Sequence, residues 1–384
     1  MQTLFRFLIA FAILLIVFPV TKADTISSNK FLVYFGTYTG AKSKGIYVSS
    51  FDSASGKLSA PELAVETVNP SFLAISPDRR FLFAVNETEH FNGQPGGGVA
   101  AFQLDAQTGK LKFLNQQLSG GANPCHIVTD ATGKFVFVAN YNSGNIEVLP
   151  AQTDGLLGVP TALIQHHGSS VNKSRQEGPH AHCVALDADN RVYVCDLGLD
   201  KVMIYHLETG GQLATNEIPF AGLKPGSGPR HIVFSPDEKW AYVVSEMGST
   251  VTALAHDAKT GALKEIQTVS TLPADFHGYN SGAEIALHPS GKFLYASNRG
   301  HNSIAVFAID EKSGQLTPVQ FQSTLGKTPR GFAIDPTGQF LIAANQDSDN
   351  VVVFRIDEQS GKLTETGQSF EVGKPVDVAF VPME

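Results

Sequence analysis

The feature that most constrains the fold is a phrase that the chain repeats about every 50 residues. Each copy has a Gly-Pro or Asn-Pro type start, a short apolar strand, a tight turn and a second strand that commonly ends in Asn. Six copies lie at 69–87, 123–141, 178–197, 228–246, 282–299 and 328–346. A seventh is split, because 374–382 holds only a first strand and 30–39 only a second. The pattern predicts an all-β, seven-bladed β-propeller, closed by pairing between its N- and C-terminal strands.

The spacing within each copy predicts four short strands. Residues alternate in the period-2 manner of a sheet, as in 293–296, and no helical periodicity of useful length competes. Most copies end in a Ser/Thr-Gly hairpin such as 55–58, 108–111 and 313–316, where Gly supplies the positive φ that tight turns need. Seven first strands are anchored by Pro70, Pro124, Pro179, Pro229, Gly282, Pro329 and Pro375.

The first 23 residues read as a secretory signal peptide. Arg6 precedes an apolar run at 7–20 and a small-residue end at 21–23. An uncleaved anchor is the alternative, but a spanning helix needs roughly 20 apolar residues. We therefore expect residues 24–384 to form one exported propeller, periplasmic or secreted, with no stable membrane association after cleavage. A closed ring has no free sheet edge, so we expect a monomer.

Charge and cysteine content narrow the partners. The chain carries 28 Lys and Arg against 36 Asp and Glu, a net charge of −8, so we expect no nucleic-acid partner. Cys183 and Cys195 flank the turn at 187–190 almost symmetrically and should face each other across two strands. We hypothesise a disulfide between them; the alternative is two small buried thiols, as for Cys125.

One mouth of the ring should collect polar side chains, because the first strand of each blade starts where the second strand ends. The positions that follow the second strands are Thr37, Glu87, Tyr141, Leu197, Glu246, Arg299 and Gln346. The starts of the inner strands include Cys125, His126, His180, His182, Arg230, His231, Glu284, Arg330 and Asp377.

Arginine and histidine gathered at the opening of a net negative chain predict a site for a small anion, because guanidinium groups match carboxylate and phosphate. Alternatively, His126, His182 and His231 only hydrogen-bond between blades. A charged side chain near the axis is costly unless it is paired, so Arg230 and Arg299 should each have an acidic partner. Glu246 and Glu284 are the obvious candidates.

Other chemical signatures are absent or weak. The chain has no Gly-x-Ser-x-Gly elbow, no Walker loop and no cysteine-pair zinc pattern, so we expect no cofactor. His180 with His182, or His166 with His167, lacks a clear carboxylate or cysteine companion, so we expect no metal. The insertion at 165–177 precedes Gly178–His182, and we expect it to fold over the mouth as a lid.

Five phrases carry a family resemblance: Tyr34–Thr39, Gly178–His182, Gly228–His231, Ser245–Glu246 and Ser297–Arg299. With them, residues 30–381 resemble the bacterial 6-phosphogluconolactonase family of seven-bladed propellers, whose relatives include the fungal carboxy-cis,cis-muconate cyclase. The resemblance implies an active site of His182, Arg230, Glu246 and Arg299. Predicted export is a departure, because the phosphorylated lactone of the pentose phosphate route is cytoplasmic.

We therefore hypothesise hydrolysis of a sugar-type or other anionic lactone. Either His182 or Glu246 would deprotonate water, while Arg230 and Arg299 hold the substrate anion and the developing oxyanion. His126, His180, His231, Glu284 and Arg330 are the further substrate-binding candidates. The alternatives are a lactone-forming cycloisomerase that uses the same residues and a non-enzymatic binding propeller.

Overall fold

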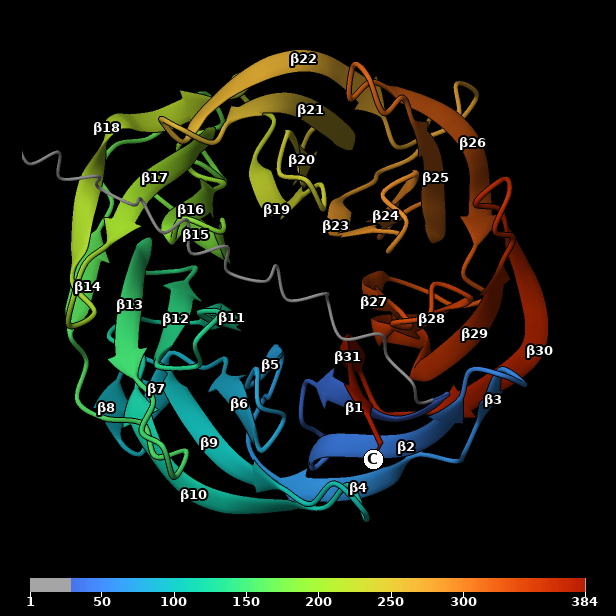
Figure 1. The fold of residues 1–384 in the computed structure, drawn as a ribbon, viewed down its shortest axis with the longest axis horizontal. Helices are drawn as coiled ribbons and strands as arrows, with labels where there is room; N and C mark the ends of the chain where they lie inside the picture. The colour runs from blue at the N-terminus through green and yellow to red at the C-terminus, as the bar shows by residue number, and fades with distance from the viewer. Residues whose placement is uncertain (1–28, 384) are drawn as a thin grey trace, which may run out of the picture.

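The computed structural model describes residues 29–383, and these form the predicted seven-bladed propeller (Figure 1). The seven blades surround a central axis, with the first strand of each repeat innermost. Blades 2 to 7 are four-stranded antiparallel sheets. Blade 2 consists of β5 (Leu73–Ile75), β6 (Phe81–Asn86), β9 (Gly98–Leu104) and β10 (Leu111–Leu118), and blade 3 of β11 (Pro124–Thr129), β12 (Phe135–Asn140), β13 (Asn145–Pro150) and β14 (Ala162–Gln165). Blade 4 consists of β15 (Ala181–Leu186), β16 (Arg191–Asp196), β17 (Lys201–Leu207) and β18 (Leu213–Gly222), and blade 5 of β19 (Pro229–Phe234), β20 (Trp240–Ser245), β21 (Thr250–Asp257) and β22 (Ala262–Ser270). Blade 6 consists of β23 (Gly282–Leu287), β24 (Phe293–Asn298), β25 (Ser303–Ile309) and β26 (Leu316–Ser323), and blade 7 of β27 (Pro329–Ile334), β28 (Phe340–Asn345), β29 (Asn350–Ile356) and β30 (Leu363–Glu371).

Blade 1 closes the ring as the split repeat predicted. Its strands are β1 (Lys30–Thr37), β2 (Gly45–Asp52), β3 (Lys57–Leu58), β4 (Glu62–Glu66) and the innermost β31 (Pro375–Pro382). β31 pairs antiparallel with β1, from Phe31 opposite Pro382 to Gly36 opposite Asp377. The register then shifts between Gly36 and Thr37.

Three small elements complete the described chain. A separate hairpin pairs β7 (His90–Phe91) with β8 (Gln94–Pro95), and a single 3₁₀ turn, η1, covers Gln346–Ser348. Within residues 29–383 no helix has the length and apolar character to cross a membrane. The predicted signal peptide at 1–23 lies outside the described residues.

Apolar side chains fill the seven interfaces between neighbouring blades, one cluster to each interface. Between blades 7 and 1, for example, the rings of Phe51 and Phe340 meet edge to face at 5.5 Å. The hairpin glycines fit against these rings: a Cβ on Gly56, where φ is +73°, would lie 2.3 Å from Phe340. Glycine therefore serves both the turn, as predicted, and the close packing of the next blade.

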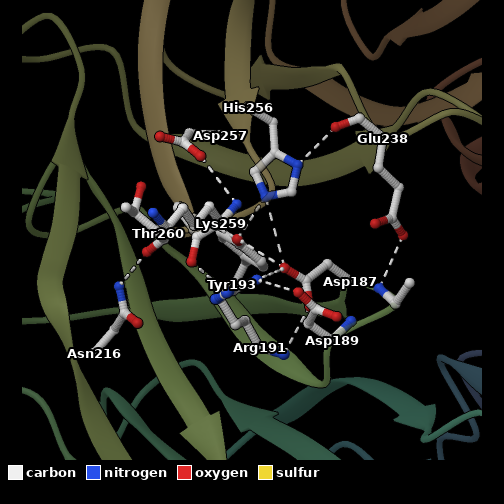
Figure 2. Close-up of polar contacts among 12 residues, drawn as sticks. Asp187, Asp189, Arg191, Tyr193, Asn216, Glu238, His256, Asp257, Lys259 and Thr260 are labelled. Atoms are coloured by element: carbon white, nitrogen blue, oxygen red, sulfur yellow. Dashed lines mark hydrogen bonds and ion pairs between the residues drawn. The ribbon is translucent and has the colours of Figure 1, made fainter. Parts of the chain in front are cut away.

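A polar network joins blades 4 and 5 near the turn between β15 and β16, at the end of these strands opposite the predicted mouth (Figure 2). Tyr193 on β16 donates to Asp187 at 3.1 Å, and its hydroxyl oxygen lies 3.2 Å from the carbonyl oxygen of Gly261 in the next blade. His256 lies 2.9 Å from the Tyr193 hydroxyl, and its Nδ1 lies 2.7 Å from the carbonyl oxygen of Glu238. Tyr34, Tyr242 and Tyr295 likewise donate to hairpin glycine carbonyls of the following blade.

The predicted disulfide is wrong, although the predicted pairing is right. Cys183 and Cys195 stand directly opposite each other on β15 and β16, but both are free and buried, as is Cys125. Directly opposed strand residues have Cβ atoms about 4.5–5.5 Å apart, mostly beyond the separation of about 3.5–4.5 Å that a disulfide needs. The Cys183 thiol instead lies 3.5 Å from His126 Nε2.

Candidate active site

A cavity of about 390 Å³ opens where the inner strands begin and the second strands end. Every blade contributes to its lining, and the 165–177 insertion contributes too. The lining residues are Tyr38, Glu87, Cys125, Tyr141, Arg175, His182, Glu246, Arg299 and Arg330. The predicted mouth is therefore a real hollow, and it is built from side chains that lie far apart in the sequence.

The structure separates the predicted residues into two groups. His182, Glu246, Arg299 and Arg330 line the cavity, together with Glu87, Tyr141 and Cys125 from the predicted mouth positions. Thr37 does not, because its hydroxyl donates to the Gly45 carbonyl, and Tyr38 lines the cavity instead. The predicted residues outside the lining are His126, His180, Arg230, His231 and Glu284, and the mouth positions Leu197, Gln346 and Asp377.

Glu246 is the centre of a guanidinium cluster. Its Oε1 accepts from Arg175 Nη2 at 2.6 Å, and its Oε2 lies 3.2 Å from Arg230 Nε and 2.7 Å from Arg299 Nη2. Burial alone would raise the pKa of Glu246, but Arg299, Arg230 and Arg175 together hold it at about 2. The predicted pairing of Glu246 with Arg230 and Arg299 is confirmed, and the carboxylate stays ionised at neutral pH.

Arg230 lies beneath the cavity and supports it. Its Nη1 donates to the carbonyl of Ala283 at 2.8 Å and to His231 Nε2 at 3.1 Å, while its Nε donates to Glu246. The side chain is only 3% exposed. Arg230 therefore positions Glu246 rather than facing a bound molecule, which differs from the substrate contact that we expected.

Arg299 faces the cavity. Nη2 donates to Ser281 Oγ at 2.7 Å and to the Gly282 carbonyl at 3.0 Å, which fixes the guanidinium beside Glu246. Its Nε has no acceptor among the described residues. Burial, and then the charges of Arg230 and Arg330, lowers the pKa of Arg299 to about 10, so the group remains a cation at neutral pH.

Of the three histidines on the inner strands, only His182 lines the cavity. Its Nδ1 is buried and makes no hydrogen bond to a described residue, while its ring lies edge-on to Tyr141 and His231. Burial, reinforced by the charges of Arg230 and His231, lowers the pKa of His182 well below its usual value. His182 is therefore a neutral imidazole at the wall of the cavity.

The other two histidines fit the structural alternative of bonds between blades. His126 Nδ1 accepts from the Val184 amide at 3.4 Å, across the boundary between blades 3 and 4. His231 Nδ1 lies 2.8 Å from Glu284 Oε1 in the next blade. Neither lines the cavity, so the prediction that they bind substrate gains no support.

His180 and Glu284 are also held away from the cavity. His180 stacks on Tyr141 at 4.5 Å, with Nδ1 3.0 Å from the Tyr141 carbonyl oxygen. Glu284 accepts from the Ile285 amide at 3.0 Å and binds His231. Burial raises the pKa of Glu284 to about 7, with Arg230 opposing the rise.

Arg330, on β27 of blade 7, is a cation of the lining without an ion pair to a described residue. Its guanidinium lies 5.5 Å from the centre of the Tyr38 ring, and it makes no hydrogen bond or ion pair within residues 29–383. Tyr38 donates to Glu87 Oε2 at 2.9 Å. Burial lowers the pKa of Arg330, but Tyr38, Glu87 and Glu246 outweigh this and raise it.

Arg175 is the site residue that the sequence reasoning missed. It belongs to the predicted lid at 165–177, and its Nη2 donates to Tyr141 Oη at 3.1 Å as well as to Glu246. The signal was the length of this insertion directly ahead of Gly178–His182, but insertions follow no repeat position, so no register could place Arg175.

The cavity is not neutralised by its own groups. Its lining carries three arginines, Arg175, Arg299 and Arg330, and two glutamates, Glu87 and Glu246. Within the described part of the chain, no three His, Cys, Asp or Glu side chains are grouped as metal ligands would be. An excess of guanidinium groups beside a neutral histidine suits the binding of an anion and proton transfer to or from it.

Comparison with known proteins supplies the family. The family model described as lactonase, 7-bladed beta-propeller, matches residues 32–380. The chain belongs to this family. The resemblance inferred from the repeated phrases is thereby confirmed.

Individual relatives of this lactonase-family chain also carry lactonase names. A 6-phosphogluconolactonase of Bacillus subtilis is 41% identical over 305 residues, which cover 79% of this chain and 85% of that protein. A 6-phosphogluconolactonase of Formosa agariphila is 36% identical over 308 residues, 79% of this chain and 86% of that protein. The solved structure of a periplasmic gluconolactonase from Pseudomonas aeruginosa is 37% identical with a TM-score of 0.87, covering 92% of this chain and all of that one.

Proposed function

We propose that the chain is a lactone hydrolase that opens a sugar-type, anionic lactone by direct attack of water. The observation that carries the proposal is the neutral, unbonded His182 beside the guanidinium cluster, in a chain of the lactonase family. The names of the relatives, 6-phosphogluconolactonase and periplasmic gluconolactonase, support lactone hydrolysis.

His182 is the better candidate for the base. Both oxygens of Glu246 are occupied by arginines, whereas no arginine among residues 29–383 hydrogen-bonds to His182, which also lines the cavity. In the proposed reaction His182 takes a proton from water as the water oxygen attacks the lactone carbonyl. Arg299 stabilises the oxyanion, and Arg330 binds the anionic part of the substrate. The ring C–O bond then breaks, and His182 returns the proton to the leaving alkoxide.

The low pKa of His182 suits the second half of this sequence. A protonated His182 next to Arg230 and His231 is strongly acidic, so it gives its proton readily to the alkoxide. The balance is one water consumed and one hydroxy acid formed. A lactone-forming cycloisomerase would conserve mass, so the mass of the product distinguishes the two reactions.

The test is hydrolysis of phosphorylated and unphosphorylated aldonolactones by the protein without residues 1–23, with the spontaneous rate subtracted. We expect turnover, and His182→Gln should lower kcat by about 10²- to 10⁴-fold, the usual effect of a positioned base. The control is His180→Gln, from the same phrase but outside the cavity lining, with a loss below about 10-fold. Absence of turnover on every lactone would exclude the proposal.

We also propose that residues 1–23 direct export and are removed. The pattern of Arg6, the apolar run at 7–20 and the small residues at 21–23 supports this, as does the periplasmic relative. N-terminal sequencing of the exported protein should begin at Asp24, and gel filtration should show a monomer. Recovery of the chain only in membranes, with Met1 retained, would favour the uncleaved anchor.

A further inference from the structure

The insertion at 165–177 is fastened to the mouth end of blade 4 at several points. His166 Nδ1 lies 2.6 Å from Asp196 Oδ2, and both side chains are buried. Ser170 donates to Asp200 at 2.6 Å, and Gln176 donates to the Leu197 carbonyl at 2.9 Å. These contacts hold the backbone of the lid, so a side chain between them has a defined position over the cavity.

Arg175 is that side chain, and it extends from the lid to contact blades 3 and 5. Only its Nη2 is engaged, with Tyr141 and Glu246. Its Nε and Nη1 make no hydrogen bond within the described residues, and 38% of the side chain is exposed. By contrast, Arg230 and Arg299 are almost buried and are also tied to backbone carbonyls. Of the three arginines that contact Glu246, Arg175 is therefore the one with the most free donors.

Glu246 does not need Arg175 for neutralisation. Arg230 and Arg299 already meet its Oε2, so the third guanidinium adds positive charge to a cavity that holds Arg330 as well. A charge-assisted, bidentate contact with a phosphate or carboxylate is the chemistry that an exposed guanidinium edge favours.

We propose that Arg175 is a specificity-determining residue that binds, together with Arg330, the anionic substituent that the lactone carries away from its reacting carbonyl. This inference rests on the proposed lactonase function and adds to it the residue of the lid that selects for this substituent, a phosphate or a carboxylate. Arg175 binds this group with the donors that Glu246 and Tyr141 leave free.

The test compares specificity ratios. For wild type, Arg175→Gln and Arg175→Lys, kcat/KM is measured on a 6-phosphorylated aldonolactone, on its unphosphorylated counterpart and on a lactone with a carboxylate in place of the phosphate. Arg175→Gln should lower the ratio of phosphorylated to unphosphorylated kcat/KM about 10- to 100-fold, mainly through KM, as loss of a charged contact does. Arg175→Lys should restore part of the ratio. Comparison of the carboxylate-bearing lactone with the phosphorylated one shows which anionic substituent the site prefers.

Lys173→Gln is the matched control, because it removes the same charge from an exposed position of the same insertion. It should leave the ratio within about 2-fold, since exposed charges act weakly through water. An unchanged ratio in Arg175→Gln, or an equal change in Lys173→Gln, would overturn the proposal.

Binding of inorganic phosphate, measured by calorimetry, separates this inference from the proposed function. Wild type should bind phosphate more tightly than Arg175→Gln by about 10-fold. If wild type opens no lactone but phosphate binding still depends on Arg175, the lactonase proposal fails and the anion site stands. If lactones are opened but neither the ratio nor phosphate binding changes, the role of Arg175 is refuted.

Discussion

At the scale of single residues, a chain of hydrogen bonds links the buried carboxyl of Glu284 to the cavity. Glu284 binds His231 Nδ1, His231 Nε2 accepts from Arg230, and Arg230 donates to Glu246. Because Arg230 is only a donor, Nε2 must be the acceptor and Nδ1 must carry the proton. An ionised Glu284 strengthens this arrangement, because a carboxylate accepts from Nδ1 more strongly than a protonated carboxyl does.

We predict that kcat/KM falls as the pH is lowered, with the midpoint of this acid limb near pH 7. As pH falls through the pKa of Glu284, about 7, the carboxyl takes a proton and holds His231, and through it Arg230, less strongly. His182 contributes no limb there, because its pKa is far lower. Glu284→Gln accepts from His231 Nδ1 at every pH, so it should flatten the limb while lowering the rate at pH 8.

The measurement is a pH–rate profile from pH 5 to 9 for both proteins. Asp377 shares the raised pKa of about 7, because burial and then Glu284 raise it, but it binds the Leu73 amide rather than the arginine chain. Asp377→Asn is therefore the control and should keep the limb. A limb that persists unchanged in Glu284→Gln would contradict this account.

At the scale of elements, the network in Figure 2 joins blades 4 and 5 through one buried carboxylate. Asp187 accepts from Arg191 and Tyr193 at 3.1 Å, and it lies 3.6 Å from His256 Nε2. Burial raises the pKa of Asp187, but His256, Arg191 and Tyr193 lower it to about 2. Burial lowers the pKa of His256, and Asp187 together with the Glu238 carbonyl raises it above its usual value.

Asp187→Asn should lower the free energy of unfolding by about 3 kcal/mol, as removal of one partner of a buried ion pair does. His256 stabilises the fold fully below its unfolded pKa of about 6.5, and this is lost as pH rises through the folded value. Asp187 stabilises the fold above about pH 4 and loses this as pH falls toward 2. The loss in Asp187→Asn should therefore be largest near pH 5–6 and smaller at pH 8, measured by urea unfolding.

Asp189→Asn is the matched control from the same turn. Asp189 also lies 3.1 Å from Arg191 Nη1, but its side chain is 63% exposed, so we expect a change below about 1 kcal/mol. Equal losses in the two variants, or a loss in Asp187→Asn that does not vary with pH, would refute the assignment.

At the scale of the whole molecule, the ring depends on β31. This strand is the innermost strand of blade 1, and it contacts the inner strands of blades 2 and 7. Val378 and Val381 belong to the clusters on the two sides of blade 1. Without β31, β1 would expose an unpaired edge, and both clusters would lose contacts.

A chain that ends at Gly373 should unfold at least about 10 °C below the full chain, because three buried valines and a strand pairing are lost. Thermal unfolding followed by circular dichroism measures this. A synthetic peptide of residues 374–384 should restore part of the loss, and the same peptide with Val378→Asp should not. An unchanged unfolding temperature would show that closure by β31 contributes little.

Much of the fold and part of the site could be predicted from the sequence. The period of the repeat implied seven blades, and the split copy implied the pairing of β1 with β31, because each blade must bury both faces. Strand register then placed Glu87, Tyr141, His182, Glu246, Arg299 and Arg330 at one mouth. These inferences use only local periodicity, which a sheet preserves.

Tertiary structure alone decided which of these side chains face the cavity and which partner each one takes. Arg230, His231 and Glu284 occupy mouth positions, yet packing between blades directs them into a buried hydrogen-bond chain. Arg175 comes from an insertion, and Tyr38 takes the place predicted for Thr37 because β1 extends to Thr37 and Tyr38 is the residue that follows it. Side-chain direction, loop path and pairing depend on contacts between segments distant in sequence, whereas the repeat depends only on spacing along the chain.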